Sequence, residues 1–373
     1  MSLRILLVGG GTGGHVFPLT AVAEELGAGS GNKPGDTKIY FMGSGELIAE
    51  ESRKLNAPCY RIAAPKWRRY LSAANFIDLL KVPVAFFQSL LYVWFIMPDV
   101  VFSKGGYSSF FPLLAAKILF IPIVIHESDS VPGFVNKVFG HFSKRIFLGF
   151  QSAVKFFNPR KCQVVGVPMR PEVLEQIPID DARAVFGFKN TNPVLYIGGG
   201  SQGAQALNDV LMLSVIKLIE KFNIIHQTGA SNYSAMQREL GNIIAEQKSA
   251  LGPKIQEGYA LVSQLSARQL AAAYSTASLA VIRSGSQAFE IAARGIPMIL
   301  VPLASAAANH QFFNAMEIAR FGATIISQDN LQPHILLNEI QKTFSARDEL
   351  SKKILAFAKS DASRVIANHL KQS

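Results

Sequence analysis

The amino-acid sequence predicts an α/β protein built from two doubly wound parallel-sheet domains. Short apolar runs, rich in β-branched residues and bounded by glycine or proline, alternate with helical patterns along the chain, as buried parallel strands do. A strand, a glycine loop and a helix near the start return in the same order about half a chain later. The length of 373 residues is sufficient for two domains.

The apolar runs give the expected strands of each domain. In the first domain they lie at 4–10, 38–44, 99–106 and 121–128, with a helical pattern at 20–28. In the second they lie at 193–200, 223–229, 279–285 and 296–302, with a helical pattern at 287–297. This alternation predicts right-handed βαβ connections. The expected domains are 1–166 and 167–349, because the segment VGVPMRPEVLEQIP between them contains three prolines, which disfavour regular structure.

Composition excludes several protein classes. The chain is 49% hydrophobic and 17% charged, so it can bury large cores and is not intrinsically disordered. Its two cysteines, Cys59 and Cys162, fit a reduced compartment and provide neither a metal cluster nor a disulfide framework. The start MSLRILLVGGG has a short apolar run and no small-residue cleavage site, which favours a strand over a signal peptide.

The net charge of +11 is concentrated in the first half of the chain. Residues 1–168 contain 18 Lys+Arg and 10 Asp+Glu, whereas residues 169–373 contain 19 and 16. Such a basic surface suits an anionic partner, which could be nucleic acid, anionic lipid or a phosphorylated substrate. Alternatively, the excess charge serves only to keep the protein soluble.

An apolar segment at 75–97 is predicted to be a core or interfacial helix. A membrane-spanning helix needs about 20 uninterrupted apolar residues, and Lys81, Pro83 and Gln88 interrupt this run. The preceding KWRRYL mixes basic residues with Trp67 and Tyr70. Such a mixture beside an apolar helix suits a membrane surface, and a solvated loop is the alternative.

Two glycine loops fit the fingerprint G-x-G-x-x-G, separated by 198 − 9 = 189 residues. Their glycines are Gly9, Gly11 and Gly14 in the first, and Gly198, Gly200 and Gly203 in the second. Such loops bring backbone N–H groups and a helix N-terminus close to phosphate. NAD binding also requires an acid at the end of the second strand. The nearest acid, Glu46, lies beyond a glycine turn, which disfavours an oxidoreductase.

Single polar residues at these loops suggest binding and catalysis. His15 follows the last glycine of the first loop, where a neutral imidazole could take a proton from an attacking hydroxyl or hydrogen-bond a ligand. Ser201 and Gln202 lie in the second loop and Arg170 ends GVPMR. Glu290 lies where a loop passes into a predicted helix. Its carboxylate could accept hydrogen bonds from ribose hydroxyls. Alternatively, it could be an acid of the first helical turn that interacts favourably with the helix dipole.

Other chemistries lack support. The sequence contains no P-loop, no H-E-x-x-H and no D-x-D motif. HESD, residues 126–129, could suggest a metal cluster, but it follows the apolar run IPIVI, which favours a ligand-facing loop.

Five motifs in order resemble those of the MurG-type glycosyltransferases, which are UDP-N-acetylglucosamine:undecaprenyl-pyrophosphoryl-muramoyl-pentapeptide N-acetylglucosaminyltransferases. They are GGTGGHVFP at 10–18, KGGYSS at 104–109, HESDSVPGFVNK at 126–137, GVPMR at 166–170 and GGSQGAQALN at 199–208. The resemblance extends from Ile5 to SDASRVIANHL near the C-terminus.

The resemblance implies a GT-B fold, in which two Rossmann-like domains face each other across a cleft. It implies that a C-terminal helix at about 350–373 packs back on the first domain. The implied reaction is an inverting, metal-independent transfer of GlcNAc from UDP-GlcNAc to the C4 hydroxyl of the muramoyl group of lipid I, giving lipid II without a cofactor. Peptidoglycan synthesis, and with it cell wall biogenesis, cell shape and cell division, would be the process served.

The resemblance also implies where the enzyme works and what it binds. Its first domain would receive the undecaprenyl-pyrophosphoryl acceptor on an anionic membrane surface, peripherally, at the cytoplasmic face of the bacterial cell membrane. Its second domain would hold UDP, and nucleic acid would not be a partner. The basic KWRRYL segment, with Lys66, Trp67, Arg68 and Arg69, would contact the membrane.

Site roles transfer residue by residue onto the matching motifs. His15 would be the general base. Residues on the donor side would be Thr12, Gly13, Gly14, Asp129, Arg170, Ser201, Gln202, Glu290 and Gln311. Residues of the acceptor loop would be Gly105, Gly106 and Tyr107. Backbone N–H donors, Arg170 and a helix end would stabilise the leaving diphosphate in place of a metal.

Three positions depart from the family pattern. HESD stands where many relatives have HEQN, so Asp129 replaces an asparagine that contacts the donor, and a carboxylate cannot donate as an amide does. RSGSQAFE is one residue shorter than the usual Arg-to-Glu spacing before Glu290. His310 replaces a residue that is often acidic or Gln. Alternatives are a GT-B enzyme with another lipid acceptor and a non-catalytic nucleotide-sugar-binding relative.

Overall fold

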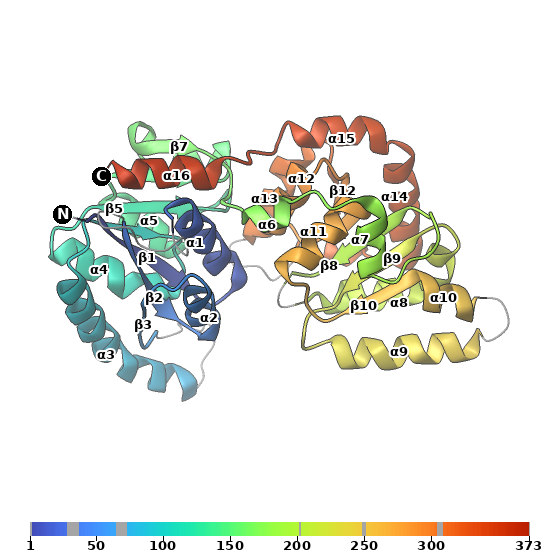
Figure 1. The fold of residues 1–373 in the computed structure, drawn as a ribbon, viewed down its shortest axis with the longest axis horizontal. Coiled ribbons are helices and arrows are strands. Elements are labelled where there is room, and N and C mark those ends of the chain that lie inside the picture. Colours follow the sequence, from blue (N-terminus) through green and yellow to red (C-terminus); the bar gives the residue numbers. More distant parts are fainter. Residues whose placement is uncertain are drawn as a thin grey trace. The chain divides into compact units, whose positions relative to one another are not determined.

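The computed structural model describes residues 2–27, 37–64, 73–200, 203–247, 251–303 and 309–372, with 73–80 described by backbone alone. The chain forms two compact units, one of Met1–Arg170 with Lys359–Ser373 and the other of Pro171–Ala358. The division falls inside the proline-containing segment, a few residues beyond the expected 166. Each unit contains one parallel sheet with helices packed on it (Figure 1), which confirms the predicted fold class.

The first unit is built on a seven-stranded parallel sheet of order β3-β2-β1-β4-β5-β6-β7. Its strands are β1 (Arg4–Gly10), β2 (Lys38–Ser44), β3 (Cys59–Arg61), β4 (Val100–Ser103), β5 (Ile123–Glu127), β6 (Arg145–Leu148) and β7 (Cys162–Val164). Its helices are α1 (Gly13–Glu25), α2 (Glu46–Lys54), α3 (Ala73–Ile96), α4 (Phe110–Ile118), α5 (Phe134–Gly140) and α16 (Ala362–Lys371), with 3₁₀ turns at Tyr107–Ser109, Gln151–Phe156 and Pro159–Lys161.

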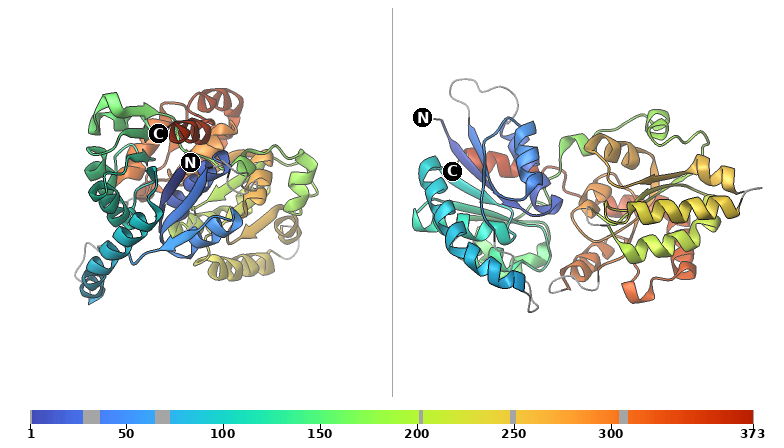
Figure 2. Two further views of the ribbon diagram at one scale, coloured as in Figure 1. Left: turned by 60° about the vertical axis from the view of Figure 1, so that its left-hand side comes forward. Right: turned by 90° about the horizontal axis from the view of Figure 1, so that it is seen from below.

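Both faces of this sheet are buried, so its strands read as continuous apolar runs. Alternating side chains of β1 separate the two cores: Ile5 and Leu7 point to one, and Leu6 and Val8 to the other. Helices α1, α2 and α16 cover the first face, and α3, α4 and α5 cover the second (Figure 2). This doubly wound arrangement is the one that alternating strands and helices predict.

The C-terminal region differs in detail from the single helix expected at about 350–373. Helix α15 (Arg347–Leu355) belongs to the second unit, and α16 belongs to the first, where it packs on α1. Just after α15, Phe357 packs against the rings of Phe289 and Phe321. Lys359 Nζ then donates to the carbonyl of Val164, 2.9 Å away, at the start of the return to the first unit.

The second unit repeats the plan with a six-stranded parallel sheet of order β10-β9-β8-β11-β12-β13. Its strands are β8 (Val194–Gly198), β9 (Asn223–Gln227), β10 (Tyr259–Val262), β11 (Ala277–Ile282), β12 (Met298–Leu300) and β13 (Thr324–Ile325). Its helices, with α15, are α6 (Pro171–Leu174), α7 (Ile179–Val185), α8 (Gln205–Ile219), α9 (Tyr233–Glu246), α10 (Gly252–Gly258), α11 (Ala267–Thr276), α12 (Gln287–Ala293), α13 (His310–Ala319) and α14 (Pro333–Ser345), and a 3₁₀ turn lies at Gln328–Asn330.

The core of the second unit lies between its sheet and helices α8, α10 and α14. Leu195 and Ile197 of β8 face this core together with Leu211 and Val215 of α8. Helix α11 begins with a capping box, in which Ser266 and Gln269 satisfy each other's backbone N–H groups. Helix α11 also packs on α7 and β8, so helices lie on both faces of this sheet as well.

The apolar segment of the first unit forms one helix, α3, with Pro83 inside it. No helix among the described residues is long and apolar enough to span a membrane. Helix α3 packs on α4 and buries Val93 and Ile96 in the core, while Phe87, Trp94 and Phe95 are exposed. The segment is therefore a core helix that keeps an apolar outer face.

Candidate active site

Both glycine loops lie where the strand order of their sheet reverses. In the first unit, β1 is flanked by β2 on one side and β4 on the other, and in the second, β8 is flanked by β9 and β11. Ligands of open parallel sheets bind outside the carboxyl ends of the strands at such a switch point. The segments after β1, β4 and β5, and those after β8, β11 and β12, therefore form two half-sites, one in each unit.

The first glycine loop leads into α1. Thr12 is the N-cap residue of α1, Gly13 is buried and Gly14 is exposed within its first turn. The N–H groups of a first helical turn have no partner within the helix and carry a partial positive charge. This loop can therefore approach a diphosphate closely.

His15 lies in the first turn of α1, half-buried. Its ring faces the segment that follows β4: a side chain at Gly106 would place its Cβ 3.4 Å from Nε2 of His15. Gly106 also has a φ of +84°, which favours glycine. Tyr107 packs its ring on Gly11. Of the predicted acceptor-loop residues, Gly106 therefore lies beside His15, and Tyr107 lies beside Gly11 of the first glycine loop.

The HESD loop is held by one buried carboxylate. Glu127 ends β5 and accepts hydrogen bonds from the backbone N–H of Asp129 (2.9 Å), from that of Gly133 (3.0 Å) and from Nδ2 of Asn136 (2.9 Å). Burial raises the pKa of Glu127, and the carboxylate of Asp129 raises it further, while Lys104 lowers it. Asp129 is half-buried in this loop.

Lys104 was not singled out from the sequence, although it directly follows the apolar strand β4. It is 2% exposed, and its Nζ donates to Oγ of Ser128 in the HESD loop. Burial lowers its pKa to about 8, and the carboxylates of Glu127 and Asp129 oppose this shift. A charged residue immediately after a buried strand was the signal that could have revealed it.

His126 is a structural residue rather than a metal ligand. It is fully buried, and its Nε2 donates to the carbonyl of Gly166 at 2.8 Å. Burial, and after it the charge of Lys104, lower its pKa well below the usual value, so the ring is neutral. No three His, Cys, Asp or Glu side chains of the described ranges gather in a way that could hold a metal ion.

Arg170 is the last residue of the first unit before the chain enters the second, and its side chain lies against α1. Its guanidinium carbon is 4.0 Å from the centre of the Phe17 ring. That ring in turn covers Gly13, because a Cβ at Gly13 would lie 2.6 Å from it. Arg170 is therefore stacked beside the start of α1, within the first half-site.

The second glycine loop packs against the segment after β9. A Cβ at Gly203, whose φ is +78°, would lie 2.4 Å from the carbonyl oxygen of Thr228. Ser201 and Gln202, expected on the donor side, lie outside the described residues. Helix α8 starts directly after this loop at Gln205, so backbone N–H groups of its first turn point toward the loop.

A chain of hydrogen bonds anchors Glu290 in the first turn of α12. Tyr274 OH donates to Oε2 of Glu290 at 3.0 Å. Nε2 of Gln287 donates to the hydroxyls of Tyr274 (3.0 Å) and Tyr196 (2.7 Å), and the Tyr196 hydroxyl donates to Oε1 of Gln227 at 2.7 Å. Burial raises the pKa of both tyrosines, so both remain neutral donors.

Two further segments, which follow β11 and β12, meet at Gln311, a residue predicted for the donor side. Ser284 Oγ donates to the carbonyl of Gln311 at 2.6 Å. Oε1 of Gln311 accepts from the backbone N–H of Leu303 at 2.9 Å. Gln311 is therefore fixed at the start of α13, beside the residues that follow β11 and β12.

A neutral network lies behind the second glycine loop. His226 of β9 is fully buried between Tyr259 OH (2.8 Å from Nδ1) and Oδ1 of Asn208 (3.0 Å from Nε2). Nδ2 of Asn208 donates to the carbonyl of Thr228 at 3.1 Å. Burial lowers the pKa of His226 to about 3, so this network carries no charge.

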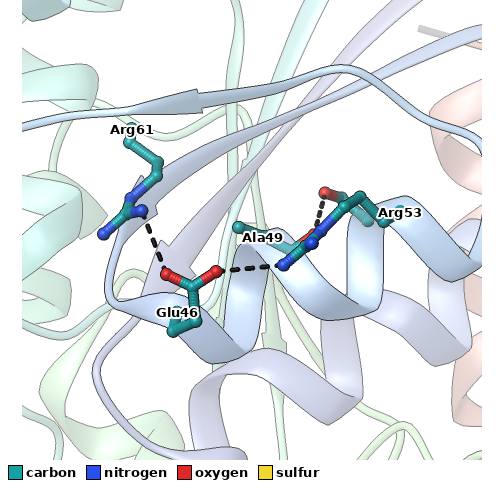
Figure 3. Close-up of polar contacts among 5 residues, drawn as sticks. Glu46, Ala49, Arg53 and Arg61 are labelled. Atoms are coloured by element: carbon teal, nitrogen blue, oxygen red, sulfur yellow. Dashed lines mark hydrogen bonds and ion pairs between the residues drawn. The ribbon is translucent and has the colours of Figure 1, made fainter.

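Glu46, the acid closest to the end of β2, is engaged by two arginines (Figure 3). Oε1 of Glu46 pairs with Arg53 and Oε2 with Arg61, both at 3.0 Å. Arg53 also donates through Nε to the carbonyl of Ala49 at 3.1 Å. Both carboxylate oxygens therefore already have cationic partners, which argues further against the NAD interpretation. The predicted membrane residues Lys66–Arg69 lie outside the described part of the chain.

Family comparisons cover most of the chain. Residues 5–148 match the glycosyltransferase family 28 N-terminal domain, and residues 194–369 match the glycosyltransferase family 28 C-terminal domain. These ranges contain both glycine loops, the HESD loop and Glu290.

Individual relatives agree with the family match. The chain is 31% identical to the UDP-N-acetylglucosamine--N-acetylmuramyl-(pentapeptide) pyrophosphoryl-undecaprenol N-acetylglucosamine transferase of Legionella pneumophila (strain Paris), over 100% of this chain and 97% of that protein. It is 33% identical to the transferase of the same name from Treponema denticola, over 89% of this chain and 86% of that protein.

Solved structures also resemble this chain. The crystal structure of Acinetobacter baumannii MurG has a TM-score of 0.72 and 26% identity, with full coverage of both chains. A UDP-GlcNAc 2-epimerase from Neisseria meningitidis has a TM-score of 0.68 at 11% identity, which shows a shared fold alone. The chain is therefore a glycosyltransferase that belongs to family 28, among its MurG-type members.

Proposed function

We propose that the chain transfers GlcNAc from UDP-GlcNAc to the C4 hydroxyl of the muramoyl group of lipid I, with inversion and without a metal ion. The named activity of relatives that match along most or all of the chain supports the donor and the undecaprenyl-linked acceptor. The first unit takes the acceptor, and the second takes UDP-GlcNAc. The product is lipid II, the disaccharide-bearing intermediate of peptidoglycan synthesis.

The position of His15 carries this proposal. The imidazole lies directly after the glycine loop and against Gly106 of the acceptor loop. There it takes the proton of the attacking hydroxyl, while the hydroxyl oxygen bonds to the anomeric carbon and the bond from that carbon to the UDP oxygen breaks. One displacement at this carbon inverts its configuration.

Donor binding is assigned to the second half-site together with Arg170. Glu290 accepts hydrogen bonds from the ribose hydroxyls of UDP, and Gln311 donates to the sugar. Ser201 and Gln202 with the N-terminus of α8, and Thr12, Gly13 and Gly14 of the first unit, serve the diphosphate. Arg170 supplies a positive charge for the leaving UDP, so that fixed donors replace a metal.

The test is transfer of labelled GlcNAc from UDP-GlcNAc to a short-chain lipid I analogue in the presence of EDTA. We expect product under these conditions, with the configuration of the new bond inverted as read by NMR. Transfer that requires an added metal would contradict the metal-free mechanism. An absence of transfer by protein that binds UDP would reject the acceptor or the activity itself.

We further propose that an apolar face of the first unit contacts an anionic bilayer at the cytoplasmic side of the membrane. Exposed large apolar side chains of this face are Phe87, Leu91, Trp94 and Phe95 on α3, Ile118 and Phe120 at the end of α4, and Phe134 and Phe142 on and after α5. Phe134 stacks on Phe110 of α4, and Lys117 lies 4.3 Å from the ring of Phe142. Aromatic and basic residues together suit a lipid surface.

Vesicle sedimentation tests this surface. Replacing Phe95 and Phe120, which are 71% and 92% exposed, by Ser should weaken binding to vesicles that contain anionic lipid. Replacing Lys66, Arg68 and Arg69 by Ala should weaken it by roughly 1 kcal/mol per charge and should matter less at high salt. Leu213→Ser, an exposed residue of the second unit, is the control. Unchanged binding in both sets would exclude this face.

A further inference from the structure

A glutamine of α12, Gln287, lies at the branch point of the hydrogen-bond chain that reaches Glu290. Its Nε2 donates to the hydroxyl of Tyr274 at 3.0 Å and to that of Tyr196 at 2.7 Å. Tyr274 belongs to α11 and Tyr196 to β8, so one side-chain amide joins three elements of the second unit. Gln287 and Glu290 are three residues apart on α12, which places them on the same face of that helix.

We propose that Gln287 is a positioning residue for the donor nucleotide. It directs the hydroxyl of Tyr274 onto Glu290 and ties α12 to the second glycine loop, so that Glu290 is held in the orientation that binds ribose. This inference rests on the proposed function, in which Glu290 accepts hydrogen bonds from ribose hydroxyls. It places no contact between Gln287 and the nucleotide.

The direction of the chain follows from the carboxylate at its end. An ionised carboxylate only accepts hydrogen bonds, so the Tyr274 hydroxyl donates its single proton to Oε2 of Glu290, at 3.0 Å. The Tyr274 oxygen then accepts from Gln287, which must present its NH₂ group there. The second N–H of that group goes to Tyr196, whose own proton goes to Oε1 of Gln227 at 2.7 Å. Both amide protons are therefore used, and the amide has a single orientation.

Burial makes the chain sensitive to its donor. Tyr196 is fully buried, Tyr274 is 2% exposed, and their rings meet edge to face with centroids 5.6 Å apart. Burial, and after it the charge of Glu290, raise the pKa of Tyr274, so its hydroxyl keeps the proton that it donates. Because hydrogen bonds among buried groups strengthen one another, the direction of this hydroxyl depends on the N–H that Gln287 supplies.

The chain also lies against the second glycine loop. A Cβ at Gly198 would be 2.8 Å from the hydroxyl oxygen of Tyr196 and 3.1 Å from Oε1 of Gln287. The hydrogen bond between these two side chains fits because the first glycine of the fingerprint has no side chain. Gln287 therefore joins the loop assigned to the diphosphate to the helix that carries the residue assigned to the ribose.

Calorimetry with UDP and with 2′-deoxy-UDP tests the role of Gln287 in the full-length protein. Gln287→Glu keeps the shape of the side chain but replaces its NH₂ group by an oxygen that accepts. The proton of Tyr274 should then turn from Glu290 to the new carboxylate. We expect the affinity for UDP to fall about tenfold. The affinity for 2′-deoxy-UDP should fall only about threefold, because this nucleotide offers Glu290 one hydroxyl fewer.

A double-mutant cycle with Glu290 distinguishes positioning from a general effect on the fold. Glu290→Ala lacks the carboxylate that Gln287 orients, so adding Gln287→Glu to it should change UDP affinity by less than about twofold. Gln237→Glu, the same substitution at an exposed position of α9, is the control and should bind as wild type does. Equal losses with and without Glu290, or an unchanged affinity ratio between the two nucleotides in Gln287→Glu, would overturn the proposal.

Tyr196→Phe decides the question should Gln287→Glu not fold. It keeps the ring and removes the hydroxyl that accepts from Gln287. One of the two hydrogen bonds that fix the amide is then lost, so the affinity ratio of UDP to 2′-deoxy-UDP should fall by about twofold. An unchanged ratio in Tyr196→Phe would overturn the proposal in that case.

The same measurements separate this inference from the proposed function. Glu290→Ala that binds both nucleotides as wild type does refutes the ribose role of Glu290, and the role of Gln287 with it. A loss of affinity in Glu290→Ala, together with a wild-type ratio in Gln287→Glu, leaves the proposed function intact and refutes the positioning role alone. Transfer of GlcNAc to the lipid I analogue by wild-type protein tests the activity independently of both residues.

Discussion

The two glycine loops share a strand, a loop and a helix, but different polar groups support them. Behind the first loop lie ions: the ammonium of Lys104 and the carboxylates of Glu127 and Asp129. Behind the second lie neutral groups, with His226 hydrogen-bonded to Asn208 and to a tyrosine hydroxyl. The same order of strand, glycine loop and helix thus stands in two different electrostatic environments.

This difference shows what a glycine fingerprint does and does not specify. Glycine permits close approach of backbone to phosphate in both loops. The residues around the loop decide what happens next: an imidazole beside the first is suited to proton transfer, and a carboxylate anchored by tyrosine beside the second is suited to binding. We therefore expect variants of the first half-site to lower kcat and variants of the second to weaken donor affinity.

The largest expected effect is that of His15→Ala. Loss of a general base should lower kcat by about 10²–10⁴-fold, with UDP affinity nearly unchanged because we assign the ribose and uracil of UDP to the second unit. Steady-state kinetics and calorimetry with UDP measure the two quantities. His334→Ala, at an exposed position of α14, is the control. A normal kcat in this variant would show that His15 is not the general base. It would also contradict the catalytic role that we expect for the first half-site.

Glu290→Ala should act on binding instead. Removing the carboxylate costs hydrogen bonds to the ribose, so UDP affinity should fall by about 1–3 kcal/mol, while kcat at saturating donor stays close to wild type. Titration calorimetry with UDP and with 2′-deoxy-UDP measures the two affinities. The variant should discriminate less between the two nucleotides than wild type does. Glu339→Ala serves as control. Full donor affinity in Glu290→Ala would reject the ribose role.

The buried histidines predict stability that depends on pH. The pKa of His226 is about 3 in the folded protein, against about 6.5 when unfolded, so below pH 6.5 the unfolded chain binds more protons. The contribution of His226 to the free energy of unfolding is therefore fully present above pH 6.5. It decreases as the pH falls, by about 1 kcal/mol at pH 5.5.

Hydrogen exchange of β9, corrected for intrinsic rates, measures this loss within the second unit. His226→Gln should remove the dependence there. In that variant the first unit should keep its own pH dependence, because the pKa of His126 is also lowered well below its usual value. Protection of β9 that is equal at pH 7.5 and 5.5 in wild type would contradict the neutral network.

The smallest expected effect is that of Tyr274→Phe. It removes the hydroxyl that donates to Glu290 at 3.0 Å and leaves the ring, so UDP affinity should fall by about 0.5–1.5 kcal/mol. In Glu290→Ala the same substitution should have almost no further effect. Equal losses in both backgrounds would show that Tyr274 acts on the fold of the second unit and not through Glu290.

Much of the fold could be predicted from sequence patterns that depend on neighbouring residues. Apolar runs such as those of β1 and β8 predicted buried parallel strands because both faces of such strands are covered. His15 was singled out because it follows the last glycine of the first loop, whereas Tyr107 was predicted only through the resemblance to MurG-type enzymes. The C-terminal region was harder: α15 and α16 form separate helices because Phe357 packs in one unit and Lys359 pairs with the other, and neither contact is local in sequence.

Residue order and periodicity were enough to predict the α/β class, the repeated glycine loops and the resemblance to MurG-type enzymes. Only the tertiary structure showed that Lys104 is buried and faces the HESD loop, and that Gln287 and Tyr274 anchor Glu290. Residues 104 and 128 are brought together by neighbouring strands, β4 and β5. Burial and partner charge set the protonation of such groups, and both are properties of the packed sheet.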